Sequence, residues 1–120
     1  MNNFVKILFL MSMVFYSAHA SNGQSVVTLL NDNDNTVLDI IFGEHVISLE
    51  PGFHTNLSLA QVQAQGVAVS VTLHGTAYQF DVISDIFTQS DVFKLSVDPG
   101  LLGLHVEFSN GGFSFKANDV

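Results

Sequence analysis

The sequence predicts an all-β domain, an antiparallel two-sheet β-sandwich of about eight or nine strands and of immunoglobulin-like size. Apolar and polar residues alternate with a period of two along most of the chain, and β-branched and aromatic residues are frequent. Gly, Asn, Asp and Pro interrupt the alternation at roughly every 8 to 12 residues, a spacing typical of short strands joined by turns. No segment shows a convincing helical period. A small closed β-barrel is the alternative fold.

Residues 1–20 have the features of a secretory signal peptide, and the mature domain is expected to span residues 21–120. Lys6 precedes a mainly apolar run from Ile7 to Phe15, and the small residues of Ala18-His19-Ala20 supply a cleavage site. This run has nine residues, whereas a membrane span needs about 20. No second apolar stretch is long enough to span a bilayer, so we expect no membrane insertion after cleavage.

The first expected strand, residues 26–30, leads into the polar turn of residues 31–35, Asn-Asp-Asn-Asp-Asn. A hairpin follows over residues 37–49 with its turn at Gly43-Glu44, and His45 falls at the end of its apolar face, beside the turn. The alternation places five apolar residues on this face: Leu38, Ile40, Phe42, Ile47 and Leu49.

A strand at residues 53–59 is expected next, and residues 60–65 have room for a helical turn. The second hairpin covers residues 67–82 and turns at either His74-Gly75 or Gly75-Thr76. The two registers differ by two residues, so both predict the same core face. Its members are Val67, Val69, Val71, Leu73, Tyr78, Phe80 and Val82.

Residues 84–91 form a longer connection, in which Ile86 and Phe87 are expected to plug one end of the core. The strand at residues 92–97 then ends at a Pro-Gly turn. The segments 47–52 and 95–100 share a pattern that ends in acidic-Pro-Gly, and we interpret both as strand-ending turns.

The last hairpin covers residues 104–117 and is expected to turn at Asn110-Gly111, a pair that tolerates positive φ values. Pairing outward from that turn sets Phe108 opposite Phe113, Val106 opposite Phe115 and Leu104 opposite Ala117. The other face then carries four polar residues: His105, Glu107, Ser114 and Lys116.

One stretch of this pattern runs from Leu29 to Val37, then through Phe42-Gly43 to Leu49-Glu50-Pro51-Gly52 and an alternating strand. It resembles the pattern of small secreted β-sandwich modules, including surface-anchoring repeat domains and periplasmic accessory proteins of exopolysaccharide modification. The resemblance carries no functional residue.

Charge and cysteine content restrict the partners and the compartment. After residue 20 only Lys94 and Lys116 oppose eleven acidic residues, a net charge of −9 with His neutral. Such a chain lacks the cations that neutralise phosphates, so nucleic acids and anionic membranes are disfavoured and a charged partner is expected to be basic. The chain also has no Cys, which favours the bacterial periplasm over the extracellular space because small secreted eukaryotic domains usually carry disulfides.

Four histidines of the mature chain are candidate metal ligands, because imidazole is the commonest metal ligand in proteins. Their spacing gives no support, since no two lie at i and i+2 on one strand face. Unrelated rim or surface histidines are the alternative interpretation. The four are His45, His54, His74 and His105.

The polar turn offers a second candidate, a divalent-cation site formed by Asp32, Asp34 and Asp39, because Ca²⁺ prefers such oxygen ligands. The segment does not fit an EF-hand loop, since Val37 stands where that loop requires Gly. Asn and Asp are also typical turn residues, and we favour the turn interpretation.

Three functions are compatible with the sequence. The favoured one is a non-catalytic binding or assembly module of the cell envelope, which contacts another envelope or extracellular protein through a sheet edge or loops. The alternatives are a small-ligand or divalent-cation binding protein and, third, an enzyme. The chain has no Gly-x-Ser-x-Gly motif, no Cys nucleophile and no phosphate-binding glycine loop, so we expect neither catalysis nor a cofactor. The sequence does not specify the oligomeric state.

Overall fold

The computed structural model describes residues 25–82 and 84–117, and the signal peptide expected at residues 1–20 lies outside them. Within these ranges the chain forms nine strands, one α-helix and one 3₁₀-helix, η2. In chain order they are β2 Val26–Asn31, β3 Leu38–Phe42, β4 His45–Leu49, β5 His54–Ser58, α2 Leu59–Gln65, β6 Val67–Leu73, β7 Thr76–Val82, η2 Ser84–Ile86, β8 Asp91–Asp98, β9 Gly103–Phe108 and β10 Gly111–Lys116.

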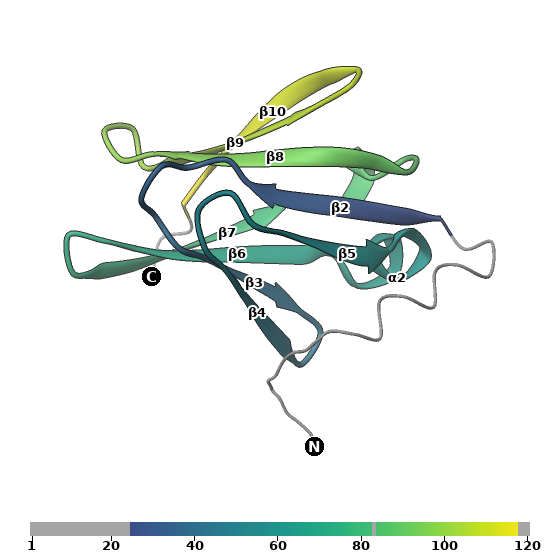
Figure 1. The fold of residues 1–120 in the computed structure, drawn as a ribbon, viewed down its shortest axis with the longest axis horizontal. Helices are drawn as coiled ribbons and strands as arrows, with labels where there is room; N and C mark the ends of the chain where they lie inside the picture. Colours follow the sequence, from purple (N-terminus) through teal and green to yellow (C-terminus); the bar gives the residue numbers. More distant parts are fainter. Residues whose placement is uncertain (1–24, 83, 118–120) are drawn as a thin grey trace.

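The strands form two sheets with the orders β10-β9-β8-β2-β5 and β4-β3-β6-β7 (Figure 1). The chain is thus all-β and sandwich-like, and neither sheet closes into a barrel. Neighbouring strands are antiparallel except β2 and β8, which are parallel. The expectation of a fully antiparallel fold is wrong at this pair. After β5 joins the first sheet and β6 and β7 join the second, the chain returns to the first sheet as β8, in the direction of β2.

Two hairpins have the registers that the alternation predicts. Phe42 lies opposite His45 across the Gly43-Glu44 turn. Leu73 lies opposite Thr76, so the β6–β7 turn is His74-Gly75, one of the two predicted centres. His74 has φ 53° and Gly75 φ 83°, the two positive values that a tight type I′ turn needs.

The predicted register of the β9–β10 hairpin is wrong by two residues, although the faces are predicted correctly. The turn is Ser109-Asn110, and Phe108 pairs with Gly111. A long-range contact accounts for this choice, since the Asp91 carboxylate accepts hydrogen bonds from the Ser109 amide and hydroxyl. The observed pairs are Val106 with Phe113 and Leu104 with Phe115.

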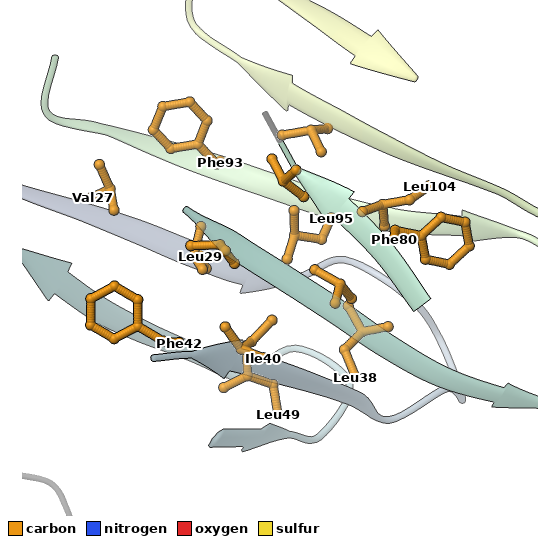
Figure 2. Close-up of a cluster of buried hydrophobic side chains, with 14 of the residues drawn as sticks. Val27, Leu29, Leu38, Ile40, Phe42, Leu49, Phe80, Phe93, Leu95 and Leu104 are labelled. Carbon is orange, nitrogen blue, oxygen red and sulfur yellow. The ribbon is translucent and has the colours of Figure 1, made fainter. Parts of the chain in front are cut away.

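The core lies between the two sheets, and Figure 2 shows side chains from both meeting there. The short helix covers one end of it: the Ser58 hydroxyl caps α2, which buries Val62. Ile86 and Phe87 are buried as predicted. The largest fully buried side chains are Phe80, Phe87, Phe93, Leu29, Leu38, Ile40, Leu95 and Leu104.

Four connections lie together at one end of the molecule, on the left in Figure 1, and we call this end the loop end. It consists of the β2–β3 connection (residues 32–37), the β4–β5 connection (50–53), the β6–β7 turn (74–75) and the β8–β9 turn (99–102). The parallel pairing of β2 with β8 brings the first and last of these side by side.

Candidate functional site

A buried asparagine organises the loop end. Asn31, the last residue of β2, is fully buried. Its Nδ2 donates to the carbonyl oxygens of Thr36 and Leu49, both at 2.8 Å. Its Oδ1 accepts from the backbone amide of Asn33 at 3.0 Å and from Asn33 Nδ2 at 2.8 Å. The side chain therefore uses both amide protons and both acceptor positions, so its burial leaves no polar atom without a partner.

Asn33 extends this network to β8. Its Oδ1 accepts from the Val97 amide at 2.9 Å, and its Nδ2 lies 3.3 Å from the Leu95 carbonyl oxygen. The Asp32 amide donates to the same Leu95 carbonyl at 2.9 Å. The polar turn is consequently fastened to the strand that runs parallel to β2.

The backbone of Asn31 also fixes the β4–β5 connection. The Asn31 amide donates to the Phe53 carbonyl at 2.9 Å, and the Gly52 amide donates to the Asn31 carbonyl at 2.8 Å. Gly52 has φ 83°, a conformation that favours glycine. The Phe53 backbone is therefore fixed, while its side chain is 63% exposed.

The structure does not bring the predicted cation ligands together. Asp32 and Asp34 are exposed in the β2–β3 connection, whereas Asp39 lies on β3 and accepts a 2.6 Å hydrogen bond from the Ser48 hydroxyl. In residues 25–82 and 84–117, no three His, Asp or Glu side chains are grouped as metal ligands. The asparagines of the turn instead form hydrogen bonds that hold the loop end together.

The four histidines lie on separate elements and are all exposed. Two of them begin strands β4 and β5, the third is in the β6–β7 turn, and the fourth is on β9. The ring of the β9 histidine, His105, has a partner, since its Nδ1 lies 3.2 Å from the Ser114 hydroxyl. In chain order the four are His45, His54, His74 and His105.

Apolar side chains project from the loop end. Leu101 is 81% exposed, and Val37 joins Phe53 there at 44%. The turn beneath Leu101 is ordered by Asp98, whose Oδ1 accepts from the amides of Gly100 and Leu101 at 2.9 and 3.2 Å. Leu101 is therefore presented by a hydrogen-bonded turn.

Both Pro-Gly turns were predicted from the sequence, but the exposed apolar side chain that follows each of them was not. Each reads acidic residue, Pro, Gly, apolar residue, and in each case the apolar residue, Phe53 or Leu101, is exposed at the loop end. The repeated four-residue pattern was the available signal. Four exposed carboxylates accompany these side chains, those of Asp32, Asp34, Glu50 and Asp98.

At the opposite end, a carboxylate joins β8 to the β9–β10 turn. Asp91 Oδ1 accepts from the Ser109 hydroxyl at 2.8 Å and from the Val92 amide at 2.7 Å, and its Oδ2 accepts from the Ser109 amide at 3.0 Å. These bonds favour the ionised carboxylate. The pKa of Asp91 is therefore below its ordinary value of 3.8, first because of the Ser109 hydroxyl and then because of the two backbone amides.

We predict that Asp91→Asn lowers the melting temperature at about pH 6 and that the difference from the unchanged chain shrinks at about pH 2.5. A carboxyl whose pKa is lower in the folded chain stabilises the fold above its unfolded pKa, and this stabilisation is lost as the pH falls through the folded pKa. Thermal unfolding at both pH values measures the effect. Asp85→Asn removes one charge at the exposed residue of η2 and is the matched control; an equal Asp91→Asn difference at both pH values contradicts the prediction.

Comparison of the chain with protein-family models, with curated proteins and with solved structures gives no match. No helix in the described part of the chain has the length and apolar character needed to cross a membrane. What these residues do present is an ordered loop end that combines exposed apolar side chains with carboxylates.

Proposed function

We propose that this chain is a secreted, non-catalytic binding module of the cell envelope, which contacts another envelope or extracellular protein through its loop end. The signal-like residues 1–20 support secretion, and the lack of cysteine favours the bacterial periplasm. We also propose that the two sheets form a β-sandwich of immunoglobulin-like size, a fold that holds loops rigidly at its ends.

The observation that carries the proposal is the presentation of Leu101. The next residue, Leu102, has φ 51°, a left-handed conformation that costs a non-glycine residue about 1–2 kcal/mol. Strained backbone of this kind is concentrated at functional positions such as active sites, ligand clamps and switch regions. Here it accompanies a leucine that is 81% exposed and so gains little burial within the chain.

The other side chains of the loop end indicate what the partner surface is like. Apolar side chains bind in apolar pockets, and the carboxylates of Asp32, Glu50 and Asp98 favour basic groups around such a pocket. The net charge of −9 after residue 20 acts in the same direction over a longer range. We therefore expect a protein partner with an apolar pocket and a basic rim.

Site-specific photocrosslinking in the producing organism tests this function. A photoreactive residue at Leu101 is expected to capture one defined envelope or extracellular protein. Val46 is the matched control, because it is an apolar side chain with 64% exposure that lies on β4, outside the loop end. Leu101→Asp is expected to weaken binding to the captured protein by about tenfold or more. Equal capture from both positions, or none from Leu101, would contradict the proposal.

A further inference from the structure

A second candidate interaction surface is the sheet edge formed by β10, the end strand of the five-stranded sheet. None of its residues is buried, and Phe113 is 50% exposed although it points to the core side of the sheet. The other edge strands each bury at least one side chain: Leu49 in β4, Leu57 in β5, and Phe80 and Val82 in β7. In the described part of the chain β10 is thus the least covered sheet edge.

The hydrogen-bonding groups of this edge can be assigned from the hairpin. Phe108 and Gly111 flank a two-residue turn and form its hydrogen-bonded pair. The backbone N–H and C=O groups of Gly111 and of every second residue after it therefore form hydrogen bonds with β9. The backbone groups of the intervening residues Gly112, Ser114 and Lys116 then face away from β9. An edge of this kind pairs readily with a further strand.

We propose that this chain forms a two-fold dimer in which β10 pairs antiparallel with β10 of a second copy, centred on Ser114. With this centre, Ser114 lies opposite Ser114 of the second copy, and Gly112 lies opposite Lys116 of the second copy. All three outward-facing residues therefore pair. A two-fold axis perpendicular to the sheet keeps the faces of both copies aligned, so Phe113 packs beside Phe115 of the second copy.

Charge complementarity identifies the occupant as a second copy. Lys116 is the only charged residue of β10, and Glu107 lies on β9 directly opposite Gly112. Lys116 of the second copy, placed opposite Gly112, is two strand spacings or about 10 Å from Glu107 at the backbone. Lys and Glu side chains together span this distance. Gly112 has no side chain of its own, and the His105 ring is the group that lies over it, with Cε1 3.1 Å from where a Cβ would stand. The symmetry forms the Lys116–Glu107 pair twice.

A lysine on an edge strand has a second interpretation, because such lysines also protect edges from pairing. The two interpretations predict opposite results for charge reversal. If Lys116 binds Glu107 of the second copy, Lys116→Glu weakens the dimer by about tenfold or more, and the double variant Lys116→Glu with Glu107→Lys restores it. If Lys116 only protects the edge, Lys116→Ala strengthens association.

Sedimentation equilibrium of the purified protein, expressed from its full coding sequence, at about 1 to 500 µM tests the dimer. Lys94→Glu is the comparison variant: it makes the same charge change on the same sheet face, on β8, where Lys94 lies directly opposite Glu107. Because it removes a cation of the same chain that competes for Glu107, it is expected to leave the dimer no weaker. Ser114→Pro removes an outward amide, so we expect it to abolish the dimer while an unchanged circular dichroism spectrum shows that the domain still folds. A monomer at every concentration, or a dimer that Lys116→Glu leaves unchanged, would overturn the proposal.

Discussion

Phe93→Ala is expected to destabilise the domain by about 3–5 kcal/mol, the largest effect of any single substitution considered. Phe93 is 1% exposed in β8, between the two sheets. Its ring contacts Phe87 edge-on at a centroid distance of 4.8 Å and Phe108 at 5.1 Å. Truncation leaves a cavity and removes both ring contacts. A domain of this size has only about 5–15 kcal/mol to lose, and without cysteine it has no disulfide to compensate.

Urea unfolding of the unchanged chain and the variant measures this loss. Phe93→Leu fills part of the cavity, and we expect it to cost about half as much. Phe53→Ala, at a ring that is 63% exposed, is the matched control, with an expected change below about 0.5 kcal/mol. A loss below about 1 kcal/mol for Phe93→Ala would show that the sheets do not pack around this ring.

Strand faces were predictable from the sequence, whereas strand order and one register were not. Alternation alone assigns β6 and β7 to a core face, because the two possible turn centres differ by an even number of residues. In the β9–β10 hairpin the local Asn110-Gly111 signal was overridden by Asp91, which bonds to Ser109 from 18 residues away. The parallel pairing of β2 with β8 likewise depends on long-range packing, for which the sequence contains no local signal.

The candidate site was predictable in part. The polar turn was recognised, but its oxygen-rich composition alone does not separate a cation loop from a hydrogen-bonded turn. A further signal was present: Asn31 continues the alternation of Val27 and Leu29, so it belongs to the core-facing side of β2. A polar residue in that position must have hydrogen-bond partners. The partners Thr36 and Leu49 could not be named from the sequence, because they depend on how the β2–β3 and β4–β5 connections fold together.

Asn31→Ala is expected to cost about 3 kcal/mol, because it leaves the buried carbonyl of Leu49 and the part-buried carbonyl of Thr36 without their donor and the Asn33 amide without its acceptor. Asn31→Asp keeps the shape but sets a buried carboxylate against these two carbonyls, so its cost at neutral pH is expected to be at least as large. Urea unfolding measures both losses. Asn35→Ala, an exposed residue of the same turn, is the matched control, with an expected loss below about 0.5 kcal/mol.

Hydrogen exchange separates this structural role of Asn31 from a general loss of stability. The Val97 amide bonds to Asn33, whose position depends on Asn31, whereas the Phe93 amide belongs to the central part of β8. In Asn31→Ala we therefore expect the protection of Val97 to fall more than that of Phe93. Equal loss at both amides would indicate global opening alone. If Asn31→Ala cost no more than Asn35→Ala, the hydrogen bonds of Asn31 would contribute little to the fold, and the rigid presentation of Phe53 at the loop end would need another cause.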